Sequence, residues 1–267
     1  MQPRSVATKT VHDHGRGTMW WALSVAAFVA MESAIYPSIR HQAGFQDTWR
    51  QLPDAMKALF GLGKELDFTT GTGFLQAEVF GFMLPLAFIG YAIALGGRAI
   101  GREEDRGTLD LLLAYPVRRG RVVVQKHLAG VAMTVALGVA VFVTLVVADE
   151  LADMRVPVAR LASVMAGVVA VGLCFGAVAL VVTCIGPSRG VAYAAASVAA
   201  LAAFLVNSLA SITSVVRPVR PLSPFRWALG DEPLRTGFHA GLLVPVAIAA
   251  VLLVVAAWAF ERRDIAT

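Results

Sequence analysis

The chain has 267 residues, of which 57% are hydrophobic and only 15% are charged, and its mean hydropathy is +0.69. Soluble globular proteins carry about 25% charged residues, so this composition argues strongly against a soluble enzyme. The net charge of +5 would suggest nucleic-acid binding in a soluble protein. Here the basic residues lie beside apolar runs, which indicates contact with membrane lipid and no nucleic-acid partner.

Six apolar segments are long enough to cross a bilayer, because a spanning helix needs about 20 mainly apolar residues. We expect them at Thr18–Tyr36, Phe74–Gly97, Val122–Ala148, Val158–Ile185, Val191–Ser214 and Phe238–Phe260. Together they use about half of the chain, which leaves too little for a sizeable aqueous domain. The sequence therefore predicts an all-α membrane protein with six transmembrane helices in a single domain, residues 1–267.

The segments that connect the spans differ in charge from one side of the membrane to the other. One side has thirteen Lys and Arg residues, and it comprises residues 1–17, 98–121 with Lys126, 186–190 and 261–267. The other side has ten, and it comprises residues 37–73, 149–160 and 215–237. Because cytoplasmic loops carry the excess of Lys and Arg near span ends, we expect both termini to be cytoplasmic.

Two of the outer loops have patterns of their own. Within residues 37–73, apolar side chains recur at helical spacing over residues 47–66, which predicts an amphipathic helix on the outer surface. The loop at residues 215–237 is rich in proline and aromatic residues, and we expect it to lie at the membrane interface. Both segments therefore predict interfacial outer helices.

The inner loop at residues 98–121 contains a short apolar run after a charged segment. Leu109, Leu112 and Leu113 have helical i, i+3, i+4 spacing, and Pro116 ends the run. A helix of two turns is marginal on its own in water, so it needs a surface to dock against. From physical chemistry alone, a partner protein and the lipid surface are equally good candidates for that surface.

The inner loop also resembles a known signature. The string Ala99-Ile-Gly-Arg-Glu-Glu-Asp-Arg-Gly-Thr-Leu-Asp-Leu-Leu-Leu-Ala-Tyr-Pro-Val-Arg-Arg119, followed by Lys126, is similar to the coupling-loop motif of type-2 ABC exporter permeases, with Arg118 where that family usually has serine. Shorter pieces extend the resemblance over essentially the whole chain, and they are Trp20-Trp-Ala-Leu23, Tyr36-Pro-Ser38, Tyr91-Ala-Ile93, Leu222-Ser-Pro-Phe225 and Phe260-Glu-Arg-Arg-Asp-Ile265. These pieces resemble the antibiotic-export and drug-export branch of the family.

This resemblance implies a permease subunit in a bacterial cytoplasmic membrane. Such permeases pair with a second permease copy or a homologous permease, and with two ATP-binding cassette ATPase subunits that bind ATP and Mg. The residues that match the family's ATPase-coupling helix are Glu103, Glu104, Gly107, Thr108, Leu109, Leu111, Leu112, Leu113 and Pro116. The sequence contains no Gly-x-x-x-x-Gly-Lys-[Ser/Thr] phosphate loop, so we expect no enzyme activity and no bound cofactor in this chain itself.

Polar residues inside the spans are candidates for contact with a transported compound, because burying them in lipid is costly. Glu32, Glu78 and Asn207 lie in the outer parts of spans one, two and five, where they would suit an amphiphilic or cationic cargo. The alternative is local pairing at the interface, for instance of Glu32 with Arg40. We therefore expect an exporter of a hydrophobic or amphiphilic compound (a drug, an antibiotic or a lipid-like molecule); the alternatives are an ion-coupled secondary transporter and a cargo-less membrane scaffold driven by an ATPase.

Two local patterns predict details of helix packing. Pro85 lies inside the second span and predicts a kink there. Gly172 and Gly176 form a small-x-x-x-small step that allows close helix contact. For this step, packing within the chain is a better explanation than a seam between two copies.

Overall fold

All regular elements in the described part of the chain are helical. The computed structural model describes residues 6–40, 51, 53, 56–57, 67–105, 107, 118–186, 188–210, 212–230 and 233–263, and no strand occurs among them. Six helical segments there are long and apolar enough to cross a membrane. The predicted all-α membrane fold with six spans is therefore confirmed.

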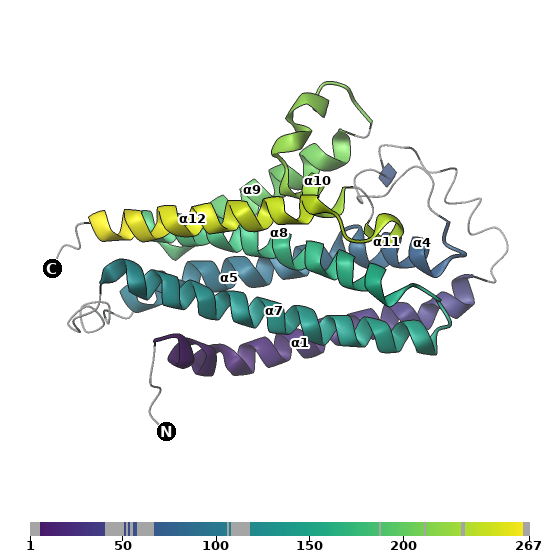
Figure 1. The fold of residues 1–267 in the computed structure, drawn as a ribbon, viewed down its shortest axis with the longest axis horizontal. Coiled ribbons are helices and arrows are strands. Elements are labelled where there is room, and N and C mark those ends of the chain that lie inside the picture. Colours follow the sequence, from purple (N-terminus) through teal and green to yellow (C-terminus); the bar gives the residue numbers. More distant parts are fainter. Residues whose placement is uncertain are drawn as a thin grey trace.

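The six spans form an elongated bundle (Figure 1). In chain order they are α1 (Val6–Ile39); a second span built from α4 (Gly71–Leu75), η1 (Gln76–Phe80) and α5 (Met83–Asp105); α7 (Arg119–Leu151); α8 (Val158–Ile185); α9 (Arg189–Leu209); and α12 (Leu243–Arg262). The start of α1 and the end of α12 lie at the same end of the bundle. We call this the termini end, and the opposite one the far end.

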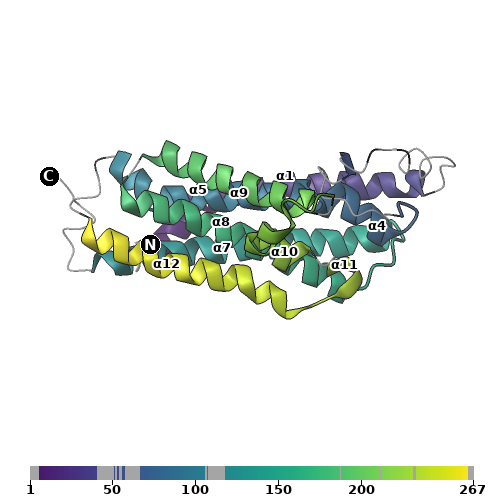
Figure 2. The same cartoon turned by 90° about the horizontal axis from the view of Figure 1, so that it is seen from above.

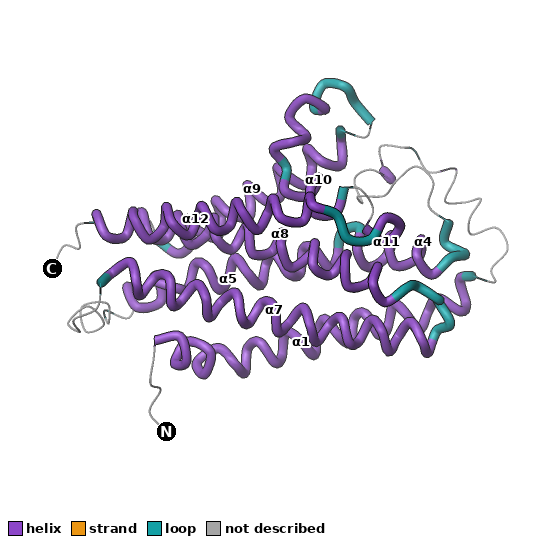
Figure 3. Tube along the Cα trace, viewed as in Figure 1, coloured by secondary structure: helices purple, strands orange, loops and turns teal. Residues whose placement is uncertain are grey.

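Four short elements lie between α9 and α12. They are η2 (Arg217–Leu222), α10 (Pro224–Leu229), α11 (Pro233–Thr236) and η3 (Ala240–Leu242). The first two and the loop before them project sideways from the bundle, as the tube trace shows (Figure 3). Three of these four elements start at or next to a proline (Pro218, Pro224 and Pro233), which suits the first turn of a helix.

Several span boundaries differ from the sequence-based expectation, including the start of the last helix, which is Leu243 and not Phe238. The first helix starts at Val6 and not at Thr18, and α5 continues past Gly97 to Asp105. In both cases the added residues contain no proline, so the helix propagates through polar sequence. The fifth span is shorter than expected and ends at Leu209. The predicted surface helix at residues 47–66 lies outside the described residues except for positions 51, 53, 56 and 57.

The centre of the bundle is the contact between α5 and α8, where glycines allow backbone to approach backbone. A Cβ on Gly96 would overlap the carbonyl oxygen of Gly176. A Cβ on Gly176 would lie 2.9 Å from the carbonyl oxygen of Ala92, and one on Gly172 would lie 3.2 Å from that of Phe88. The Gly172 and Gly176 step therefore packs within the chain, as expected.

The second span is interrupted beside Pro85. Proline has no N–H group, so the carbonyl of Gly81 loses the partner that an uninterrupted helix would supply. The chain forms a turn at residues 81–82, preceded by the π-helix η1. The helix is thus interrupted close to Pro85, where the sequence predicts a kink, and a wide helical turn precedes the interruption at Glu78.

A tight turn at the far end connects α7 to α8. The Asp149 carboxylate accepts a hydrogen bond from the Val156 backbone N–H at 3.0 Å, while Asp153 and Arg155 adopt left-handed backbone conformations with φ of 52° and 59°. The Arg155 guanidinium donates to Asp153 at 2.9 Å and holds the pKa of that carboxyl below its usual value. Arg40 lies 3.7 Å from Asp153, so the arginine considered above as an alternative partner for Glu32 forms an ion pair in this turn.

We expect Gly96→Ala to destabilise the bundle because its methyl group has no space against α8. The free energy of unfolding should fall by about 1–3 kcal/mol, the usual cost of overpacking. The matched control is Gly90→Ala in the same helix, where a Cβ meets no atom within 4 Å and where the gain in helix propensity is about 1 kcal/mol. Equilibrium unfolding in mixed detergent micelles measures both, and equal stabilities of the two variants would contradict this packing.

Candidate functional site

A groove of about 480 Å³ lies near the termini end, with α1, α5 and α9 as its walls. Its lining residues are Asp13, His14, Gly17, Thr18 and Trp21 from α1, Tyr91, Ala94, Leu95 and Arg98 from α5, and Arg189 from α9. Seen from above, α9 lies beside α5 (Figure 2). The groove thus combines apolar and aromatic walls with charged side chains near the end of the bundle.

The contact between α1 and α5 in this groove is polar. The hydroxyl groups of Thr18 and Tyr91 are 2.7 Å apart, and Trp21 stacks near Tyr91 with ring centroids 5.8 Å apart. Tyr91 is buried while Trp21 is exposed. Arg98, about two helical turns further along α5, is also exposed. An aromatic and hydrogen-bonding surface of this kind suits an amphiphilic ligand better than a purely apolar one.

Glu32 and Glu78 lie at the same level, nearer the far end. The rings of Tyr36 on α1 and Phe74 on α4 are 5.2 Å apart, and Glu32 is one turn before Tyr36 while Glu78 is about one turn after Phe74. Both carboxylates are half-buried. The structure therefore places these two predicted residues at a similar depth on the neighbouring helices α1 and η1.

Asn207 has a different environment. Its side-chain oxygen accepts a hydrogen bond from Nε of Arg220, which belongs to η2, at 3.2 Å. The rings of Phe204 on α9 and Phe82 beside α5 are 5.5 Å apart, so Asn207 is near the level of Glu78 but on a helix that flanks the other side of α5. Its contact in the structure is with the connecting segment, and the structure does not join it to the two carboxylates.

The loop between α5 and α7 begins directly after the last turn of α5. Glu103 and Glu104 belong to the last turn of α5, so the charged segment continues the span helix and Asp105 is its last residue. Gly107 follows with φ of +62°, a left-handed conformation that favours glycine after a helix end. The remaining predicted coupling residues lie outside the described part of the chain, and they are Thr108, Leu109, Leu111, Leu112, Leu113 and Pro116.

The exit of this loop is tied to the end of the last span. The Arg119 guanidinium donates to the backbone carbonyl of Arg263 at 3.0 Å, and Arg263 donates to the carbonyls of Thr183 and Gly186 at 3.5 Å each. These hydrogen bonds connect α7 and α8 to the end of α12. The start of α7, at the exit of the loop, is therefore linked by hydrogen bonds to the ends of two other spans.

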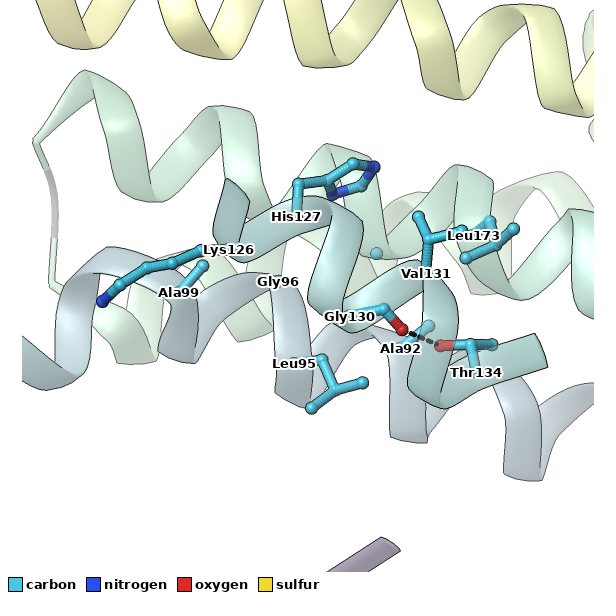
Figure 4. A pocket seen from close by; sticks show the side chains of 11 residues that line it. Ala92, Leu95, Gly96, Ala99, Lys126, His127, Gly130, Val131, Thr134 and Leu173 are labelled. Carbon is cyan, nitrogen blue, oxygen red and sulfur yellow. Dashed lines mark hydrogen bonds between the residues drawn. The ribbon is translucent and has the colours of Figure 1, made fainter. Parts of the chain in front are cut away.

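A second cavity lies between α5, α7 and α8, close to Lys126 (Figure 4). Its volume of about 20 Å³ is enough for one water molecule and is too small for an organic compound. The buried side chain of Lys126 extends past Ala99 along α5 (Figure 4). This small cavity therefore belongs to a packed helix interface and has no room for a ligand, unlike the groove beside it.

The groove residues Thr18, Trp21, Tyr91, Arg98 and Arg189 were not among the residues expected from the sequence to contact a ligand. Trp21 and Tyr91 do occur in the short pieces that resemble the permease family, and that was the one available signal. In the described residues, no group of three His, Cys, Asp or Glu side chains is placed to hold a metal ion.

Comparison with known proteins agrees with this arrangement. The chain matches the family described as ABC-2 family transporter protein over residues 4–265, which is nearly its whole length. No curated protein matches it. The chain therefore belongs to the ABC-2 family of transporter proteins, and it is a multi-pass membrane permease of the ABC transporter type.

Proposed function

We propose that this chain is the permease subunit of an ATP-driven exporter that moves a hydrophobic or amphiphilic compound, such as a drug, an antibiotic or a lipid-like molecule. The observation that carries the proposal is the groove on α1, α5 and α9, whose lining includes both aromatic and charged residues. Its charged residues lie at the termini end, and two half-buried carboxylates lie toward the far end. A molecule with an apolar body and a polar group fits both parts.

In this proposal the termini end is cytoplasmic, and the loop after α5 docks on a separate ATPase. Supporting this orientation, the end of α5 and the start of α7 lie at the same end of the bundle as the start of α1 and the end of α12, and that side carries the larger number of Lys and Arg residues. The ATPase partner, with two copies per complex, binds ATP and Mg and supplies the hydrolysis. Movement of the docked loop reaches the spans through Arg119 and the end of α12.

The groove has walls on three helices and is open on its fourth side. Most of the surface of α1 and of α9 is exposed in the single chain. A second permease copy, or a homologous permease, closes the groove in our proposal and makes it a pathway. Export to the far side of a bacterial cytoplasmic membrane then passes Glu32 and Glu78 on the way out.

For the ATPase contact, we expect the double substitution Leu112→Asp and Leu113→Asp to abolish co-purification of the ATPase encoded beside this chain. Each buried leucine contributes about 1.5–3 kcal/mol, so losing two weakens association by at least roughly 100-fold. The measurement is a pull-down from detergent with the tagged permease. Leu151→Asp, at the far end and 84% exposed, is the matched control and should retain the ATPase; equal recovery with the double variant would refute the docking role.

For cargo contact, we expect Glu78→Gln to reduce transport of a lipophilic cation such as ethidium by roughly tenfold. The carboxylate's contribution to a charge-assisted contact is about 1.5 kcal/mol or more, and the amide removes it while keeping the size of the side chain. Dye uptake into inverted vesicles containing the permease and its ATPase measures the effect. Glu150→Gln, an exposed carboxylate at the far end of α7, should transport normally; unchanged transport by Glu78→Gln would remove this residue from the pathway.

A further inference from the structure

A segment that the transport proposal does not use projects sideways from the bundle. We define the lateral arm as residues 212–230, which comprise a loop, η2 and α10 (Figures 1 and 2). Its outer residues are unusually exposed for apolar side chains, with Val215 at 81% and Leu222 at 80%. Such exposure on a projecting segment marks a surface for binding.

The lengths of the neighbouring spans place the lateral arm at a membrane boundary. The spans on either side of it are short, with 21 residues in α9 and 20 in α12. At 1.5 Å per residue each is about 30 Å long, which equals the thickness of the hydrocarbon core. The arm directly follows the far end of α9 and belongs to the connection between the far ends of the two spans, so it lies where the hydrocarbon core meets the lipid headgroups. By contrast, α1 and α7 have 34 and 33 residues and continue beyond this level.

The sequence of η2 divides its surface into three edges. A 3₁₀-helix has three residues per turn, so residues three apart lie along one edge. Arg217 and Arg220 form one edge, Pro218 and Pro221 a second, and Val219 and Leu222 a third. The prolines lack N–H groups and so leave fewer backbone donors to be satisfied in lipid. This arrangement gives a cationic edge next to an apolar one.

The base of the arm is held rigidly on the bundle. The Ser223 hydroxyl donates to the backbone carbonyl of Ala203 at 2.8 Å, and the Trp227 indole N–H donates to that of Pro221 at 2.7 Å. The buried Phe225 packs against the rings of Phe175 and Phe204, with centroids 5.9 and 5.6 Å away. The apolar and cationic edges of η2 therefore keep their orientation, which lowers the entropic cost of binding.

From these observations we propose that the lateral arm binds phospholipid in the leaflet at the far end. Val215, Val219 and Leu222 insert among the acyl chains. Arg217 of η2 contacts lipid phosphate together with Arg226 of α10, whose guanidinium lies over the Trp227 ring. Residues 212–230 include three arginines and no acidic residue, so the charge of the arm is complementary to phosphate. The inference does not depend on the cargo or on the ATPase.

Spin labels on the lateral arm test its immersion in lipid. Single-cysteine variants of the full chain, Val215→Cys and Leu222→Cys in a Cys174→Ala, Cys184→Ala background, are labelled with a nitroxide and reconstituted into phosphatidylcholine and phosphatidylglycerol vesicles. We expect both labels to collide more often with oxygen than with a water-soluble nickel chelate, as a label at the lipid-facing Val254 of α12 should. A label at Glu150 is the water-exposed control, and arm labels that behave like it would overturn the proposal.

The same labels distinguish lipid from a second copy of the chain. If the arm lies in a dimer contact, labels at Leu222 will broaden each other's spectra, and dilution with unlabelled protein will remove the broadening. That result would overturn the proposal in favour of a protein interface. Spectra that do not change on dilution, together with preferential oxygen collisions, support contact with lipid.

The role of the arginines is tested by lipid titration in native mass spectrometry of the full chain. With phosphatidylglycerol as the probe, Arg217→Ala with Arg226→Ala should weaken binding by roughly 25-fold, about five-fold for each charge near the membrane surface. Arg217→Lys with Arg226→Lys keeps the charges and should bind like wild type, and monogalactosyldiacylglycerol, which has no phosphate, should not distinguish the variants. Equal phosphatidylglycerol affinity for the alanine variant and wild type would overturn the assignment of these arginines.

Discussion

The direct approach of the α5 and α8 backbones is the constraint on which the rest of the bundle depends. Because Gly96 and Gly176 have no side chains, the second and fourth spans lie closer than ordinary residues would allow, and α8 becomes the most buried span. The other spans pack around this pair: α1 and α7 on one side, α9 and α12 on the other. The groove forms where α1 and α9 lie on either side of α5. The position of α5 itself is set by its close packing against α8.

The number and type of the spans were predictable because twenty apolar residues in a row have few alternatives to a transmembrane helix. Their ends were less predictable. The start of α1 at Val6 lies in polar sequence, where helix propagation leaves no pattern of apolar residues to detect. The fourth span, bounded by Pro157 and Gly186, matched its prediction because residues that stop helices mark both ends.

The candidate site was predictable only in part. Glu32 and Glu78 stood out because carboxylates are rare inside spans, and the structure places them at a similar depth on neighbouring helices. The partners of polar groups were not predictable: Arg40 binds Asp153 and Asn207 binds Arg220, and both pairs depend on turns whose geometry a single sequence does not specify. The groove residues around Tyr91 were missed because aromatic and hydroxyl side chains are ordinary in spans and acquire meaning only from their neighbours.

The π-helix beside Pro85 shifts the direction in which the side chains of the second span point. A π turn contains more residues than an α turn, so the side chains before and after it do not follow one continuous helical face. Before it, Phe74 meets Tyr36 of α1; directly after it, Phe82 meets Phe204 of α9, and further along Tyr91 contacts Thr18 of α1. The second span therefore contacts α1 on both sides of the π turn and α9 beyond it, so a change in the winding of η1 would alter its contacts with both helices.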